Sequence, residues 1–243
     1  MNGAGERRLR ILGLLVGGGS PELETTRLCA VSAEATGMTG AGIMLMSDDA
    51  PRGSLCTTDS VSALIEDLQF TLGEGPCVDA HHGQRPVLEP DLAQPVVTRW
   101  LAFSGPVVEA GVRAVFGFPI RIGAVRLGAL NLYCDQPGPM ADEQHADSMM
   151  MSDIAAQAIL VLQSNAPPGT LAAELASGFR VQYVVHQATG MVAAQLEIGV
   201  GHALIRLRAY AFGNELPLAE VAREVVARRL RFHAEGCETD PDS

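Results

Sequence analysis

The last fifth of the chain shows the clearest alternation of hydrophobic and polar positions. Apolar residues there recur every three or four positions, which is typical of amphipathic helices. Three such stretches follow one another, with apolar positions at Ala188, Met191, Val192 and Leu196, at Ala203, Leu204, Leu207 and Ala211, and at Leu218, Val221, Ala222 and Val225. Pro217 stands just before the third stretch, where a first helical turn tolerates proline. We expect three short helices that bury their apolar faces against one another.

The region before it alternates between two hydrophobic periods. The helical period covers residues 23–36, 63–70, 99–111 and 142–163. Short apolar runs bounded by turn residues predict strands at 42–47, 53–58, 87–88, 114–122 and 125–134. Short turns join neighbouring strands, which favours an antiparallel sheet with flanking helices. The expected fold class is therefore α+β, followed by a C-terminal three-helix bundle.

Turn-forming and polar segments divide the chain into five parts. We expect a flexible N-terminus at 1–19, a sheet-containing domain at 20–165 and a Pro/Gly hinge at 166–170. The helical module follows at 171–233, and an acidic disordered tail at 234–243 has no apolar periodicity. A chain of 243 residues fits one large or two ordinary domains, and the three C-terminal helices are too short to bury much surface by themselves.

The distribution of apolar residues predicts a cytoplasmic protein with no membrane partner. No run approaches the length needed for a membrane-spanning helix. The arginine-rich start is followed by a run of only about six apolar residues, shorter than the hydrophobic region of a signal peptide.

Charge is distributed unevenly along the chain, whose net charge is −11. Residues 171–233 carry seven arginines against five glutamates, whereas residues 1–170 and the tail are strongly acidic. An acidic body with one basic module suits selective binding of a compact nucleic-acid element rather than general coating. The chain contains no lysine, which excludes a phosphate-binding GxxxxGK[ST] loop and Schiff-base chemistry.

The basic module resembles a known family at three spaced segments. Gln-Ala-Thr-Gly-Met at 187–191, Leu-Arg at 207–208 and Leu-Ala-Glu-Val-Ala at 218–222 are similar to the ANTAR domain of bacterial transcription antiterminators. The resemblance implies a homodimer that binds tandem stem-loops in nascent transcripts. Many members open the second helix with Ser or Asp and acidic residues, where this chain has Gly199, Gly201 and His202.

Charged, aromatic and hydrogen-bonding side chains of this module are the candidate RNA contacts. Arginines can bind phosphates or base edges, and aromatic rings can stack on unpaired loop bases. The candidates are His186, Gln187, Thr189, Arg206, Arg208, Tyr210, Arg228 and Arg229. Two other readings of the module stay open: a DNA-binding helix-turn-helix, or a bundle that binds only a protein partner.

The sheet-containing region resembles a GAF domain. The resemblance rests on Leu-Gly-Glu-Gly-Pro-Cys at 72–77, on the segment 84–92, and on the strand segments 111–121 and 128–133. GAF domains bind cyclic nucleotides, haem, bilins or other small molecules, and some serve only as dimerisers, so the resemblance implies a sensor of an unknown small molecule or protein signal. We expect no cofactor. Gly75, Pro76 and Cys77 are the candidate ligand-binding residues, because amides at a new helix start favour a polar or anionic ligand. A structural turn over a packed core is the alternative.

No group of side chains indicates catalysis, so we do not expect an enzyme. The chain has no GxSxG elbow, and the neighbouring acids Glu66 and Asp67 are read as solvated helix residues. Five scattered cysteines without a CxxC pair are read as buried thiols, without a zinc site.

An apolar stripe on the predicted helix 142–163 bears on assembly. It consists of Met150, Ile154, Ala158 and Val161. Such a narrow stripe suits pairing with a second copy of the chain, or packing onto the sheet of its own domain.

Overall fold

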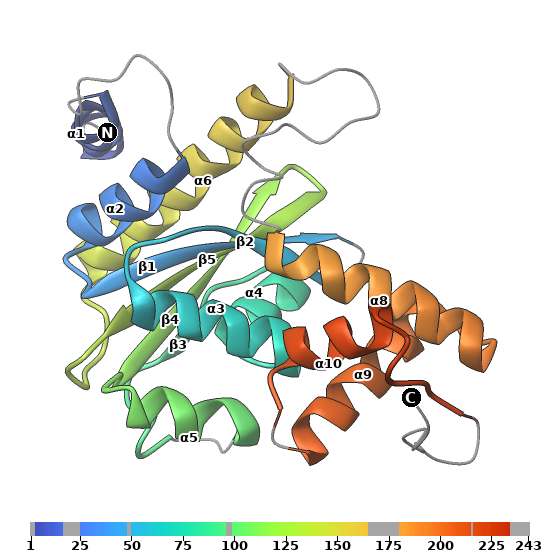
Figure 1. Cartoon of the computed structure of the whole chain (residues 1–243). Helices are drawn as coiled ribbons and strands as arrows, with labels where there is room; N and C mark the ends of the chain where they lie inside the picture. Colours follow the sequence, from blue (N-terminus) through green and yellow to red (C-terminus); the bar gives the residue numbers. More distant parts are fainter. Residues whose placement is uncertain are drawn as a thin grey trace. The chain divides into compact units, whose positions relative to one another are not determined.

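The computed structural model describes residues 3–16, 25–47, 50–95, 99–164, 180–214 and 216–233. The chain divides into two compact units, residues 1–178 and residues 179–243, which we call the first and second units (Figure 1). The predicted hinge at 166–170 and the predicted tail at 234–243 lie outside the described residues.

The first unit is built on a five-stranded sheet. Its strand order is β2-β1-β5-β4-β3, and every neighbouring pair runs antiparallel. The strands are β1 (Gly40–Ser47), β2 (Ala50–Thr57), β3 (Val87–Glu89), β4 (Ala114–Ile122) and β5 (Val125–Cys134). The expected α+β class with an antiparallel sheet is confirmed.

Helices cover both faces of this sheet (Figure 1). On one face lie α2 (Thr25–Thr36) and α6 (Asp142–Ser164), and the other carries α3 (Ser60–Leu72), α4 (Pro76–Gly83) and α5 (Leu101–Glu109). Helix α3 begins where its sequence allows a capping box: the Asp59 carboxylate accepts the amide of Ser62 at 2.8 Å, and the Ser62 hydroxyl accepts the amide of Asp59 at 2.9 Å.

The N-terminal segment differs from the expected flexible one. Residues Gly3–Val16 form helix α1, which contacts α2 and α6. Its side chain Ile11 is fully buried, and Arg7 forms ion pairs with Asp147 at 2.7 Å and Glu143 at 2.5 Å on α6. The alternation in this segment is too short to show this from sequence, because its partners lie about 140 residues away.

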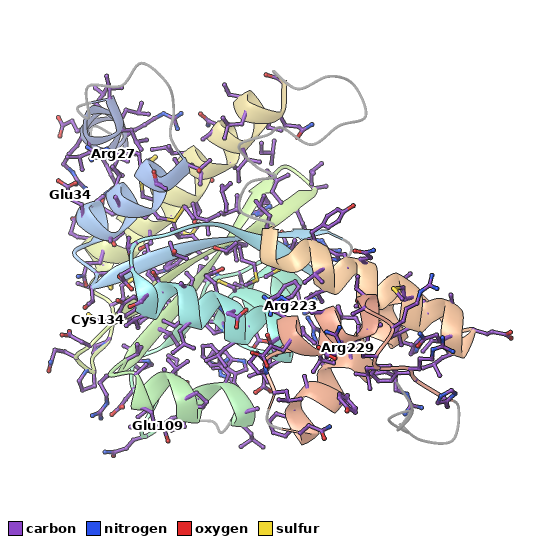
Figure 2. The ribbon with its side chains drawn as sticks, viewed as in Figure 1. Arg27, Glu34, Glu109, Cys134, Arg223 and Arg229 are labelled. Atoms are coloured by element: carbon purple, nitrogen blue, oxygen red, sulfur yellow. A yellow bond between two sulfur atoms is a disulfide. The ribbon has the colours of Figure 1, made fainter. Side chains whose placement is uncertain are left out.

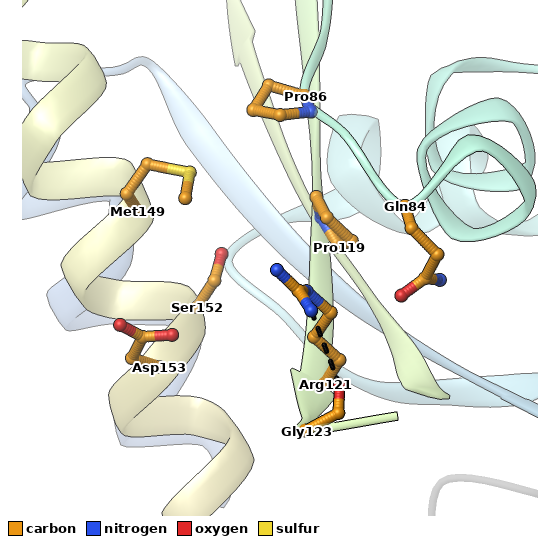
Figure 3. A pocket seen from close by; sticks show the side chains of 8 residues that line it. All are labelled: Gln84, Pro86, Pro119, Arg121, Gly123, Met149, Ser152 and Asp153. Atoms are coloured by element: carbon orange, nitrogen blue, oxygen red, sulfur yellow. Dashed lines mark hydrogen bonds between the residues drawn. The ribbon is translucent and has the colours of Figure 1, made fainter. Parts of the chain in front are cut away.

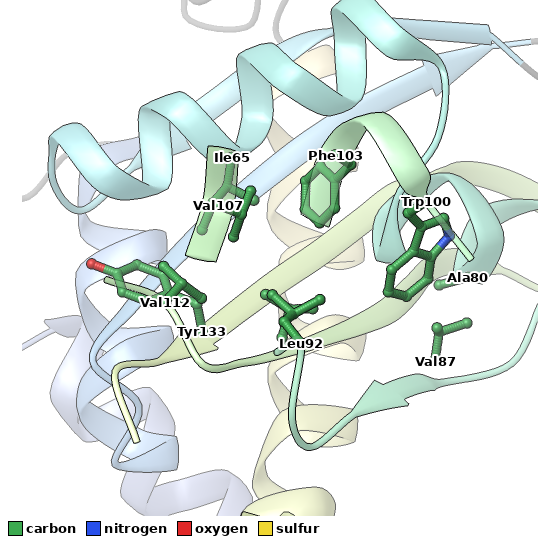
Figure 4. Packing of buried hydrophobic residues seen from close by; sticks show 10 residues of the cluster. Ile65, Ala80, Val87, Leu92, Trp100, Phe103, Val107, Val112 and Tyr133 are labelled. Carbon is green, nitrogen blue, oxygen red and sulfur yellow. The ribbon is translucent and has the colours of Figure 1, made fainter. Parts of the chain in front are cut away.

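A cluster of apolar side chains lies between the sheet and α3, α4 and α5 (Figure 4). Trp100 and Phe103 meet edge to face at 6.0 Å between ring centroids. The indole N–H of Trp100 donates to Asp79 at 3.0 Å, and the Arg99 guanidinium lies 4.5 Å from its ring centroid. The polar edge of the only tryptophan is therefore satisfied while its ring fills the core.

A disulfide corrects the expectation that all cysteines are thiols. Cys29 on α2 and Cys56 on β2 are bonded to each other across a sequence separation of 27 residues. Cys77 and Cys134 are free. Spacing alone does not reveal the pair, because only the packing of α2 against β2 brings the two sulfur atoms together.

The apolar stripe of α6 packs mainly within its own unit. Ile154 and Ala158 are buried, and α6 contacts β4 and α2, whereas Val161 near its end is exposed. The second of the two readings of this stripe is therefore the correct one for most of its length. Dimerisation stays a prediction, and the buried part of this stripe is not available as a dimer interface.

The second unit consists of the three predicted helices, α8 (Arg180–Leu196), α9 (Val200–Gly213) and α10 (Leu218–Val226). Of the twelve predicted apolar positions, all but Met191 and Leu196 are buried, and these two are half-buried. Among the described residues, no single helix is long and apolar enough to cross a membrane. Residues 183–196 and 200–213 pass that test only as a pair bent by 106°.

Candidate functional site

The Gly-Glu-Gly-Pro-Cys element at 73–77 joins three helices of the first unit. Gly73 ends α3 with a φ of 69°, a left-handed conformation that glycine adopts without strain. The carboxylate of Glu74 accepts the amides of Ala102 and Phe103 at 2.9 and 3.0 Å. These amides belong to the first turn of α5, so Glu74 caps that helix. Its negative charge interacts favourably with the positive end of the helix dipole.

The predicted ligand-binding residues are occupied within the protein. Gly75 has a φ of 133°, and a Cβ atom there would collide with the side chain of Gln69. Pro76 and Cys77 are buried, and the Cys77 amide donates to the Gln69 side-chain oxygen at 2.7 Å. Because the protein itself satisfies this amide, the geometry favours the structural turn of the alternative reading. Ligand binding at Gly75, Pro76 and Cys77 stays a prediction.

A buried polar cluster lies beside this turn. Asn131 on β5 is flanked across the sheet by Gly42 on β1 and Gly117 on β4. A Cβ atom on Gly42 would collide with the carboxyl group of Glu66, and one on Gly117 would collide with the carbonyl of Pro76. The two glycines thus make room on the sheet for the Glu66 side chain and for the start of α4.

Glu66 and Asn131 lack some of the hydrogen-bond partners that buried polar side chains normally have. Both are almost fully buried, at 2% and 1% exposure, and their side-chain oxygen atoms have no hydrogen-bond partner among the described residues. The loss of water raises the pKa of Glu66 to about 8, an effect that the nearby Asn131 amide only partly offsets. Burial, followed by the charge of Glu66, also raises the pKa of the Cys77 thiol.

The sequence-based reading of Glu66 as a solvated helix residue is therefore wrong. The strand glycines Gly42 and Gly117 were the available signal, since glycine inside a strand marks the close approach of another group. At neutral pH the cluster combines a largely protonated carboxylic acid, a primary amide and a thiol in an apolar surrounding. Such a set can donate and accept hydrogen bonds without carrying a charge.

The other face of the sheet carries a small hollow of about 260 Å³ between α6 and the end of β4 (Figure 3). Three of its polar side chains bond to backbone carbonyls of the same unit. Gln84 donates to His81, Arg121 to Gly123 and Ser152 to Ser148. Gln84, Arg121 and Ser152 thus serve the structure of the first unit, and Asp153 is the remaining charged side chain in the lining.

The predicted RNA contacts of the second unit fall into three classes of exposure. Gln187, Arg206, Arg228 and Arg229 are exposed, and His186, Arg208 and Tyr210 are half-buried. Thr189 is 1% exposed, and its hydroxyl donates to the carbonyl of Val185 at 2.7 Å. Thr189 is therefore a core residue of the bundle, and the prediction that it contacts RNA is wrong.

Several of the remaining candidates also have partners inside the unit. Arg229 binds the Glu224 carboxylate through two hydrogen bonds of 2.7 Å each. The Tyr210 ring lies edge to face against Phe232, at 5.5 Å between centroids. Burial lowers the pKa of Arg208 to about 10. Arg206, Arg228 and Arg229 are the exposed candidate arginines, and of these Arg229 is engaged with Glu224.

The described residues contain no group of three or more His, Cys, Asp or Glu side chains placed to hold a metal ion. The candidate sites are thus a buried neutral cluster in the first unit and a basic surface on the second.

An antiparallel sheet with helices on both faces defines an α+β domain, and this one encloses a polar cluster. A model of the GAF domain matches residues 22–160, more than half of the chain, and the chain belongs to the GAF domain family. The first unit is therefore a signal-sensing domain. The family match ends before the second unit begins, and the resemblance of that unit to ANTAR domains stays a prediction.

Solved structures of GAF and sensor domains are similar to this chain. One is the GAF domain of a phosphoenolpyruvate-protein phosphotransferase from Coxiella burnetii, with 17% identity, a TM-score of 0.49, and coverage of 67% of this chain and 97% of that one. A domain of a putative two-component sensor histidine kinase from Sinorhizobium meliloti has 16% identity, a TM-score of 0.48, and coverage of 60% and 96%. The comparison with curated proteins found no match.

Proposed function

We propose that this chain is a signal-responsive RNA-binding regulator of transcription antitermination. Its GAF domain receives a signal, and its C-terminal bundle binds RNA stem-loops in nascent transcripts. The role is regulatory rather than catalytic, and it belongs to the cytoplasm, where transcripts are made.

The observation that carries this proposal is the separation of apolar and basic residues in the second unit. The apolar positions of the ANTAR-like pattern form its core, while five arginines stand exposed outside it: Arg206, Arg223, Arg228, Arg229 and Arg231. Exposed guanidinium groups on a small rigid bundle suit phosphate contacts along a folded RNA. The acidic first unit disfavours binding elsewhere on the chain.

The buried cluster is the proposed input of the first unit. A small molecule that donates to Asn131 and accepts from protonated Glu66 would supply the partners that these buried groups lack. Binding there would favour one arrangement of the helices α3 and α4, between which the cluster lies.

Binding of RNA hairpins by the full-length protein tests the proposal. A pool of tandem RNA hairpins with randomised loops is selected on the protein, and the selected RNA is compared with duplex DNA of the same sequence. We expect the RNA to bind at least about tenfold more tightly, a difference of about 1.4 kcal/mol. Changing one strand of each stem should abolish this preference, and the compensating change on the other strand should restore it.

The alternatives predict different outcomes of the same measurement. A preference for duplex DNA would identify the bundle as a DNA-binding module. Equal and weak binding to both nucleic acids would leave a protein partner as the function of the bundle.

A further inference from the structure

The second unit contains a pocket, and Arg206 is the one predicted RNA contact among its lining residues. The pocket has a volume of about 380 Å³, within the range of sites that hold small ligands. It is lined by Leu196, Ile198, His202, Arg206 and His233.

Three elements bring these residues together. His202 and Arg206 are one helical turn apart on α9, so both lie on the same face. Leu196 ends α8, and Ile198 belongs to the turn before α9. The Phe232 amide donates to the Gln195 side chain at 3.0 Å, which holds the segment after α10 beside the end of α8 and thereby places His233.

The pocket combines two apolar side chains with two imidazoles and one guanidinium group. Leu196 and Ile198 are half-buried, whereas His202, Arg206 and His233 are exposed, and none of the lining residues is acidic. His202 also lies in the first turn of α9, where the helix dipole favours a negative charge. An occupant that combines a flat apolar part with a negative charge matches this surface.

We propose that the pocket holds one unpaired nucleotide of an RNA loop. The base lies over Leu196 and Ile198 and stacks on the imidazole of His202 or His233. The phosphate binds the Arg206 guanidinium, which matches its oxygen atoms in geometry and charge. This inference rests on the proposed function and specifies the part of the RNA that the bundle recognises.

The exposure of the other candidates agrees with this assignment. Thr189 is buried, and Arg229 is engaged with Glu224, so neither presents a free group to a base.

A cycle of protein variants and modified RNAs tests the pocket. Each loop nucleotide of the selected hairpin is replaced in turn by an abasic one, and binding to the full-length protein is measured. One position should lose about 5- to 150-fold in affinity, the usual range for a base stacked on a protein side chain. Arg206→Ala and His202→Ala should each weaken binding of the intact hairpin and remove most of the penalty at that position.

Arg223→Ala is the matched control, because it removes one exposed arginine from α10 outside the pocket (Figure 2). It should leave the abasic penalty unchanged. These side chains are exposed, so we expect each variant to fold. Unchanged thermal melting of each variant will confirm this.

Two results would overturn the inference. If Arg206→Ala and Arg223→Ala weaken every hairpin equally, with the abasic penalty intact, the arginines act only through charge, and the proposed function survives. If the unchanged protein binds no hairpin at all, both the pocket assignment and the proposed function fail.

Discussion

At the scale of single residues, Glu66 is the most unusual group in the first unit. Its carboxyl group is buried above Gly42 and Asn131, and its pKa is raised to about 8. In the unfolded chain the group titrates near its ordinary value of 4.5. Folding therefore opposes ionisation of Glu66, and the stability of the first unit depends on pH through this residue.

The sign of the effect predicts how pH changes stability. Below pH 4.5 Glu66 is protonated in both states, and its burial carries no electrostatic penalty. Between pH 4.5 and about 8 the unfolded state loses the proton first, so stability falls by on the order of 4–5 kcal/mol across that range. Glu66→Gln should remove this fall, and it should make the unit more stable than the unchanged protein at pH 8.

The fluorescence of Trp100, the only tryptophan, reports unfolding of this unit alone. Glu109→Gln is the control, because Glu109 is an exposed carboxylate on α5 (Figure 2). Equal pH profiles for Glu66→Gln and the unchanged protein would show that the buried carboxyl group does not titrate in this range.

At the scale of elements, the first unit is held together by links between segments distant in sequence. Glu74 connects the end of α3 to the start of α5, and Arg7 connects α1 to α6. The Cys29–Cys56 disulfide connects α2 to β2. Each link joins elements whose mutual position the sheet register alone does not determine.

The disulfide predicts that reduction weakens the first unit. A bond that closes a loop of this length restricts the unfolded chain and contributes about 2–4 kcal/mol. The double variant Cys29→Ser and Cys56→Ser should therefore unfold at lower urea concentration than the oxidised protein, and reductant should have the same effect. Cys134→Ser, which removes a free thiol, should leave the midpoint nearly unchanged.

Thiol titration of the denatured chain checks the bond directly. The protein should expose two more reactive thiols after reduction than before. Equal numbers would mean that Cys29 and Cys56 are not bonded under the conditions of purification, as expected if the reducing cytoplasm keeps them apart.

At the scale of the whole molecule, the distribution of charge and the state of assembly bear on the proposed binding of RNA. Residues 1–170 carry ten arginines against nineteen acidic residues and the last ten residues carry four more acids, whereas residues 171–233 carry seven arginines against five glutamates. The acidic parts would repel RNA, so we expect the proposed binding to fall on the bundle. Leu160 and Val161 at the end of α6 are 47% and 56% exposed, and they are available to a second copy of the chain.

A dimer predicts a preference for paired stem-loops. Two bundles joined in one dimer bind tandem loops at high effective concentration, which raises avidity by about 10²–10⁴ over a single loop. Mass photometry of the full-length protein gives its oligomeric state, and titration with single and tandem hairpins gives the ratio of affinities. A monomer with equal affinity for both would exclude this mode of action, although RNA binding itself could remain.

The sequence by itself determined the elements whose formation depends on local pattern. The apolar runs over 114–122 and 125–134, separated by a short turn, are sufficient to predict β4 and β5, because a strand and its turn are specified by neighbouring residues. The same holds for the three C-terminal helices. Their apolar positions at a period of 3.6 residues leave only one face that can be buried.

Only the tertiary structure decided which polar and sulfur-containing groups are enclosed, and by what. Glu66 is buried because two strand glycines make room for its side chain, and Thr189 is buried because its face of α8 meets the other helices. The pairing of Cys29 with Cys56 and the convergence of His202, Arg206 and His233 also join separate segments. A local hydrophobic pattern reflects the period of one helix or strand, whereas these features depend on the side chains that distant elements pack against it.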